Sequence, residues 1–154
     1  MRALSLLCIA AVLAACAGAD DSATDTTAAP AAATPAPLSL ADVAGVWDVK
    51  GTNMAGDSTI ITYTVNATAD STGWTLTFPG RQPIPLRVVA VSGDSAVVEA
   101  GPFESALRRG VQVRTSSVMR LQDGKLIGHN TSRYVNVRTA DSVVTMRSEG
   151  TRRP

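Results

Sequence analysis

Alternation of apolar and polar residues at period two is the feature that most constrains this chain. In the clearest stretch one face carries apolar or aromatic side chains and the other carries polar ones: Ile61, Tyr63, Val65 and Ala67 against Thr62, Thr64, Asn66 and Thr68. Successive side chains of a β-strand point to opposite faces, so the pattern indicates strands with one buried side. Similar runs continue almost to the C-terminus, and they predict an all-β domain.

Short segments rich in Gly, Asp, Ser and Pro separate these runs. The dipeptide Asp123-Gly124 lies between the two longest runs and is a strong hairpin signal. We count about eight strands joined mostly by short turns. An antiparallel meander of this size closes into a barrel or folds into a sandwich, because open edges invite association. Of these two we expect the closed up-and-down barrel.

Two short segments are expected to be helical. The stretch 39–42 begins with a serine suited to an N-cap and has an acid three residues later, which resembles a capping box, and Gly45 ends the turn. This predicts one helical turn before the first strand. The segment 101–110 interrupts the strand pattern, and we interpret it as a short helix from Phe103 to Arg109.

The N-terminus has the features of a bacterial lipoprotein signal. Residues 3–13 are apolar apart from Ser5 and follow Arg2. At about 1.5 Å per residue this run covers roughly half of a ~30 Å hydrocarbon core, so it fits a secretory signal rather than a membrane span. Leu13-Ala14-Ala15-Cys16 resembles the lipobox, in which small residues admit the peptidase and a thiol carries the lipid. A plain signal with a chance cysteine is the alternative.

The lipobox resemblance implies a division of the chain into a signal peptide (1–15), a lipidated Cys16 with a disordered tether (16–37), and one domain (38–154). The tether contains nine Ala, four Thr and three Pro but no large apolar side chain, so it cannot bury enough surface to fold. Acyl chains on the cysteine would anchor the protein to a membrane of the cell envelope. By resemblance to the enterobacterial sorting rule, Ala17 in place of Asp implies the outer membrane, facing the periplasm.

Gly45-Val46-Trp47, directly after the expected helical turn, resembles the start of the lipocalin and calycin family. In that family a Gly-x-Trp follows a short helical turn, and the Trp lies at the closed end of an eight-stranded up-and-down barrel. The family also packs an Arg from near the last strand across this Trp. The resemblance therefore implies a structural role for Gly45, Trp47 and either Arg147 or Arg152. It also implies a pocket for a small molecule or lipid, without naming the ligand.

Residues that support catalysis are sparse. His129 is the only histidine, and no cysteine follows Cys16, so thiol catalysis and His- or thiolate-based metal sites are excluded for the domain. We expect no enzyme activity, no catalytic residue, no metal and no cofactor. The domain has a net charge of only +3 and few aromatic residues for stacking on bases, so we also expect no nucleic-acid partner.

Polar residues on the apolar faces of the two longest runs favour a binding cavity. The apolar face of the first run becomes polar at Thr115 and Ser117, and neither face of the second is purely apolar. A packed interior does not hold such groups unless they have partners. A polar-lined cavity explains them, and an edge strand wetted on both sides explains them equally well. The candidate ligand-binding residues are Thr115, Ser117, His129, Arg133 and Tyr134.

Basic residues concentrate in residues 101–154, which carry ten Lys or Arg against four acids, and nearly all of them are Arg. Because a guanidinium fits carboxylate or phosphate, an anionic ligand inside the barrel or an anionic polymer outside it is one interpretation. The other interpretation is that these arginines lie on the solvent-exposed face of the strands and bind nothing. Our first hypothesis is a lipid-anchored, non-catalytic barrel that binds a small apolar or amphiphilic ligand. The alternative is an envelope module for protein–protein interaction or structure, without a ligand cavity and with an unspecified partner.

Overall fold

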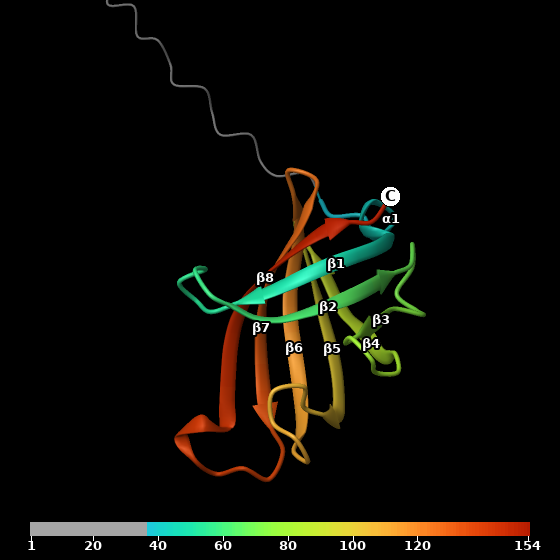
Figure 1. Ribbon diagram of the computed structural model, residues 1–154. Helices are drawn as coiled ribbons and strands as arrows, with labels where there is room; N and C mark the ends of the chain where they lie inside the picture. Colours follow the sequence, from blue (N-terminus) through green and yellow to red (C-terminus); the bar gives the residue numbers. More distant parts are fainter. Residues whose placement is uncertain (1–36) are drawn as a thin grey trace, which may run out of the picture. The chain divides into compact units, whose positions relative to one another are not determined.

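The computed structural model describes residues 37–154, drawn in colour in Figure 1. The predicted signal peptide, the lipidation site Cys16 and the tether up to residue 36 lie outside the described residues. Within the described part of the chain, no helix has the length and apolar character needed to cross a membrane.

One short helix, eight strands and a 3-10 turn make up the described residues. In chain order they are α1 (Leu40–Val43), β1 (Gly45–Thr52), β2 (Thr59–Ala67), β3 (Thr75–Thr77), β4 (Ile84–Ser92), β5 (Ser95–Glu104), β6 (Gln112–Gln122), β7 (Lys125–Tyr134), η1 (Ala140–Ser142) and β8 (Val143–Arg152). Neighbouring strands are antiparallel, and β8 pairs with β1 so that the sheet closes into a barrel in the order β1 to β8. The predicted all-β meander, its closure and the preceding helical turn are confirmed.

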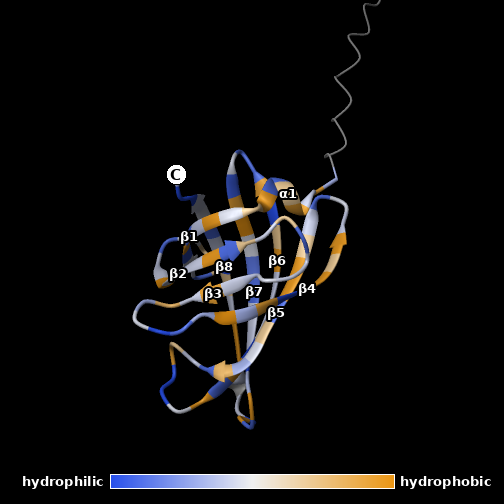
Figure 2. Ribbon diagram, turned by 90° about the vertical axis from the view of Figure 1, so that its right-hand side faces the viewer, coloured by the Kyte–Doolittle hydropathy of each residue, from blue (hydrophilic) through white to orange (hydrophobic). Residues whose placement is uncertain are grey.

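The period-two pattern divides each strand between the barrel interior and the solvent. Bands of hydrophobic and hydrophilic residues alternate along the strands in Figure 2. The buried apolar cluster inside the barrel comes from α1, the turn before β3 and five strands. Its buried members are Val43, Trp47, Val49, Val65, Ala67, Trp74, Ala96, Val98, Met119 and Leu126.

The two ends of the barrel differ in what covers them. One, here called the α1 end, holds α1, the short hairpin turns at 93–94 and 123–124, and the C-terminus, which lies beside α1 in Figure 1. The other, here called the loop end, holds the four segments 53–58, 78–83, 105–111 and 135–142. The apolar cluster occupies the half of the interior nearest the α1 end.

The expected helix from Phe103 to Arg109 is wrong. Strand β5 continues to Glu104, with a register shift between Ala100 and Phe103 where Gly101 has a φ of 104°. After β5 the Ser105 hydroxyl accepts hydrogen bonds from the backbone amides of residues 107 and 108, at 3.1 and 3.0 Å. These bonds satisfy both amides within a tight turn, and the segment forms no helix.

Candidate functional site

The α1 end is closed by a stack of three groups. Trp47 is fully buried, and its indole nitrogen donates to the carbonyl oxygen of Val43, the last residue of α1, at 2.8 Å. The guanidinium carbon of Arg152 lies 4.4 Å from the centroid of the Trp47 ring. Arg152 also donates to the carbonyl oxygens of Asp42 and Ala44. One side chain thus covers the indole and binds free carbonyls at the end of the helix.

Gly45 belongs to the same arrangement. Its φ is 141°, and an added Cβ would lie 2.8 Å from a terminal nitrogen of Arg152. A side chain at this position would displace the guanidinium from the indole. Arg147, the other arginine that the resemblance left open, pairs in register with Thr52 and His129 on the outside of the barrel. The structure therefore brings Gly45, Trp47 and Arg152 together and places Arg147 elsewhere.

The half of the interior nearest the loop end contains a cavity of about 60 Å³. Most of its lining is apolar: Ile61, Val65, Leu76, Phe78, Leu86, Val98, Ala100, Phe103, Met119 and Met146. The remainder is polar: Tyr63, Thr115, Ser117, Asn130 and Ser132. This volume holds a few water molecules or a very small organic group, and is well below the ~300–1,000 Å³ of typical ligand pockets.

The polar side chains of the cavity form a partly satisfied network. The Ser117 hydroxyl donates to the Asn130 side-chain oxygen at 2.5 Å, and the hydroxyls of Thr115 and Ser132 are 2.8 Å apart. The Asn130 amide nitrogen has no hydrogen-bond partner among the described residues, although its residue is only 6% exposed. An unsatisfied buried donor costs about 1–3 kcal/mol, so this amide lowers the stability of the fold.

Burial also affects the phenol of Tyr63. Loss of solvent raises its pKa above the ordinary value of 10.0, because the charged phenolate is disfavoured in the barrel. The nearby polar side chains of Ser148 and Asn130 lower the pKa and so oppose the shift without cancelling it. The cavity therefore carries a neutral phenol and a free amide donor on an otherwise apolar lining.

Segment 105–110, between β5 and β6, contributes to the cover of the loop end. Arg81 from the β3–β4 loop donates to the carbonyl oxygens of Glu104 and Ser105, at 2.8 and 3.3 Å. The guanidinium of Arg108 lies 4.7 Å from the centre of the Tyr134 ring and 3.6 Å from a carboxylate oxygen of Asp141. The cover is therefore fastened to loops on both sides by polar contacts.

Three aromatic residues of the cavity lining contact one another. The rings of Tyr63 and Phe78 are 5.9 Å apart in an edge-to-face contact, and those of Phe78 and Phe103 are 6.0 Å apart. Aromatic pairs of this kind gain about 0.5–1.5 kcal/mol beyond their buried area. The loop end thus has an apolar rim beneath a cover held by arginines.

The structure separates the five predicted ligand-binding residues into two groups. Thr115 and Ser117 line the cavity, and Tyr134 is buried beneath Arg108. His129 and Arg133 alternate with the inward residues of β7 and lie on the outer surface. The five therefore do not form one site. The sequence analysis did not identify Tyr63, Asn130 and Ser132 as lining residues. For Asn130 and Ser132 a signal was present, because alternation along β7 places them on the same face as Tyr134.

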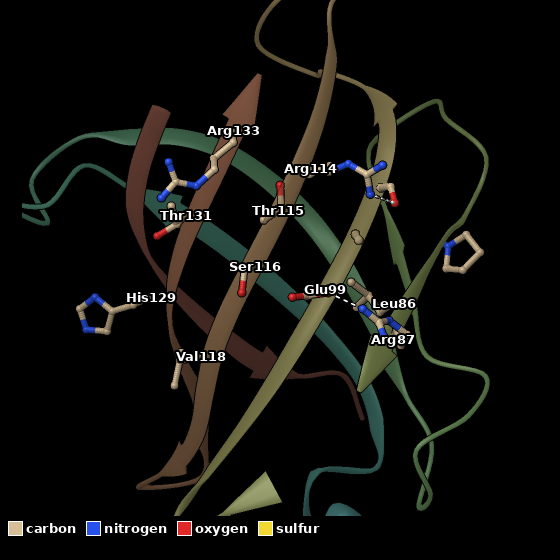
Figure 3. Close-up of a pocket in the computed structure, with 13 residues that line it drawn as sticks. Leu86, Arg87, Glu99, Arg114, Thr115, Ser116, Val118, His129, Thr131 and Arg133 are labelled. Carbon is tan, nitrogen blue, oxygen red and sulfur yellow. Dashed lines mark hydrogen bonds and ion pairs between the residues drawn. The ribbon is translucent and has the colours of Figure 1, made fainter. Parts of the chain in front are cut away.

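The outer surface of β4 to β7 carries an open groove of about 760 Å³, shown in Figure 3. It is lined by Arg87 and Glu99 on one side, by Arg114 and Ser116 from β6, and by His129, Thr131 and Arg133 from β7. Arg87 and Glu99 form an ion pair at 2.6 Å. Three arginines against one glutamate make the groove basic, unlike the uncharged cavity inside the barrel.

Among the described residues, no three His, Cys, Asp or Glu side chains form a group suited to a metal ion. Comparison of the chain with protein-family models, with curated proteins and with solved structures gives no match. The cavity and the groove are two features of the described residues that can hold a ligand.

Proposed function

We propose that this chain is a non-catalytic lipoprotein of the bacterial envelope whose barrel binds a small amphiphilic ligand at the loop end. The observation that carries the proposal is the unpartnered amide of Asn130 in a mostly apolar cavity. Binding sites for small molecules combine an apolar lining with a few polar groups that orient the ligand. A ligand acceptor atom on this amide would remove the cost of the unsatisfied donor.

The proposed ligand has one hydrogen-bond acceptor and a short apolar portion. The acceptor would bind the side-chain amide of Asn130, and the apolar portion would extend toward Phe78 and Phe103. Because the cavity holds only about 60 Å³, a larger ligand requires movement of the cover at 105–110. The contacts of Arg108 are exposed and individually weak, which suits a cover that opens.

The membrane anchor is the second part of the proposal, and it rests on the lipobox-like sequence ending at Cys16. Anchoring would place the barrel at the periplasmic face of the outer membrane, where amphiphilic molecules are at hand. Replacement of Cys16 with Ser is expected to leave an unprocessed precursor that incorporates no labelled fatty acid. Normal processing and labelling of this variant would contradict the anchor.

Native mass spectrometry of the full chain tests the ligand. We expect a reproducible additional mass on the wild-type protein and its loss in Asn130→Leu, which removes the free amide while keeping the volume similar. Met119→Leu is the matched control, because it changes another lining side chain without altering polarity, and it should retain the mass. Equal retention in both variants would reject the role of Asn130.

The small volume of the cavity favours a second function, that of an interaction module with a filled barrel. In that case the wild-type protein carries no additional mass, and a panel of lipids and metabolites gives no thermal shift. Both results together would replace the ligand-binding proposal.

A further inference from the structure

Two arginines lie directly opposite each other on the outside of the barrel. Arg114 of β6 and Arg133 of β7 are register partners, and both side chains are exposed. Like charges in this position destabilise a sheet by repulsion. The contacts between charged groups in the described residues include neither arginine, and Arg114 has only a 3.5 Å hydrogen bond to the carbonyl oxygen of Gly101. The fold thus keeps two adjacent positive charges without a protein carboxylate to offset them.

The neighbouring groups add hydrogen-bond donors and remove a competing charge. The next register pair on the same outer face is Ser116 and Thr131, and both residues line the same groove. Glu99 is the one carboxylate in the lining, and its charge is offset by Arg87 at 2.6 Å. The groove therefore combines two guanidiniums that have no carboxylate partner with two hydroxyls.

The side chains leave space for a ligand between them. In Figure 3 the guanidiniums of Arg114 and Arg133 point away from each other, Arg114 across β5 and Arg133 toward the side of Thr131. This divergence is expected of like charges with nothing between them. Rotation about side-chain torsions brings both groups onto a single anion without a change in the backbone.

From this arrangement we propose that the outer groove is a binding site for a phosphate group. Two guanidinium forks and two hydroxyls supply more donors than the two oxygens of a carboxylate accept, whereas a phosphate with two negative charges offers three free oxygens. The groove, at about 760 Å³, is large enough for an organic molecule attached to the phosphate. None of its lining residues is Phe, Tyr or Trp, which argues against single-stranded nucleic acid as the source.

An apolar margin gives the organic part of the ligand a place to bind. Val118 is 47% exposed at one side of the groove, and Pro85 and Leu86 lie at the other. Both a soluble phosphate ester and the headgroup of a phospholipid therefore fit the same chemistry. The four proposed binding groups do not line the barrel cavity, and the site does not depend on the interior binding a ligand.

The test is an NMR titration of the full chain at constant ionic strength with inorganic phosphate, with chloride as the control anion. We expect saturable shifts of the backbone amides of residues 114, 116, 131 and 133. The double variant Arg114→Gln/Arg133→Gln should weaken phosphate binding at least about tenfold, since each charge-assisted contact accounts for roughly that factor. The absence of saturable shifts at these amides in the wild-type protein would overturn the proposal.

Arg120→Gln is the matched control, because Arg120 is an exposed arginine on the same strand but outside the groove. It should change phosphate affinity less than twofold, and an equal loss in both variants would reduce the effect to net charge and overturn the site. Without phosphate, the double variant should melt at the same or a higher temperature than the wild-type protein, because it removes the repulsion. A lowered melting temperature would contradict the argument from unpaired charge.

Two further probes distinguish the source of the phosphate. Glycerol 3-phosphate represents a soluble ester, and monomeric dihexanoyl phosphatidic acid carries the same phosphate on a short lipid. Tighter binding of the lipid by tenfold or more, lost in the double variant, assigns the site to a phospholipid headgroup. Similar affinities for the two probes, both lost in the double variant, assign it to a soluble phosphate ester.

Discussion

The two ends of the barrel differ in how completely they are packed and hydrogen-bonded. At the α1 end each strong hydrogen-bonding group in the stack has a partner: the Trp47 indole binds Val43, and Arg152 binds the carbonyls of Asp42 and Ala44. In the half nearest the loop end, the Asn130 amide has no partner among the described residues, and a cavity remains between apolar side chains. One end is packed and the other is left incomplete.

This contrast indicates where stability and function reside. A buried, fully satisfied cluster stabilises the fold, whereas unsatisfied polar groups and voids lower stability and persist where a site needs them. We therefore expect substitutions at the α1 end to act on the free energy of unfolding. Substitutions at the loop end should act on binding and on dynamics, with little cost to the fold.

Truncation of Trp47 should give the largest effect. Trp47→Ala removes a fully buried indole and its hydrogen bond to Val43, and we expect it to lower the free energy of unfolding by about 3–5 kcal/mol. Phe103→Ala at the loop end should cost clearly less, because that ring is only partly buried. Urea denaturation of both variants measures the difference. Equal losses would show that the two ends contribute alike to stability and would remove the contrast.

The second prediction concerns the two arginines of β8. Arg152→Ala removes the cation–π contact with Trp47 and the bonds to two carbonyls of the helix end, and it should cost about 1–2 kcal/mol. Arg147→Ala changes an exposed side chain on the outer surface and should stay within about 0.5 kcal/mol of the wild-type protein. Thermal unfolding of the two variants in parallel measures this. A larger loss for Arg147 would contradict the assignment of Arg152 as the cover of the indole.

The fold could be predicted from the sequence because its signals are local. Alternation at period two, Asp123-Gly124 and the cap at Ser39 each depend on residues close together in the chain, and the barrel follows from their number and order. The continuation of β5 through Glu104 depends instead on a bulge at Gly101 and on contacts with β6. Nothing in the local sequence indicates that register shift, and a helix was therefore expected where a strand and a turn exist.

The site could be predicted less well, because strand pairing decides which polar residues meet. Thr115 and Ser117 line the cavity, whereas His129 and Arg133 lie on the outer face of β7, opposite to the face of Tyr134. The contacts of Tyr63 with Ser148 and Asn130 join three strands distant in sequence. The choice between Arg147 and Arg152 likewise required the register of β8 on β1.

The cavity should also make the protein sensitive to alkali through Tyr63. Burial raises the pKa of this phenol above 10.0 in the folded state, so above about pH 10 the unfolded chain loses its proton first. Stability contributed by the neutral phenol is therefore complete below pH 10 and decreases as the pH rises through the folded-state pKa. Urea denaturation between pH 9 and 11, roughly one unit either side of the ordinary tyrosine pKa, measures this loss of stability. The loss should be smaller in Tyr63→Phe than in the wild-type protein. Ser148→Ala should increase it, because Ser148 lowers the pKa of Tyr63.

At the α1 end the smallest effect is expected, and it has the opposite sign. Asp48 lies on the outer face of β1, where Arg153 contacts both of its carboxylate oxygens and Thr64 donates at 3.3 Å. The hydrogen bond from Arg153 lowers the pKa of Asp48 below the ordinary 3.8. The contribution of this ion pair is therefore present above about pH 4 and is lost as the pH falls through the lowered pKa.

Because both partners are exposed, solvent and salt screen the pair, so the change should be small. Asp48→Asn and Arg153→Gln should each flatten the acid limb of stability to a similar degree, and high salt should remove the difference from the wild-type protein. A change at Asp48 should leave the alkaline part of the stability–pH curve unaltered, and a change at Tyr63 should leave the acid part unaltered. The opposite result would show that the two halves of the barrel are coupled. Independent limbs would mean that the incomplete half of the barrel can change its occupancy without disturbing the packed one.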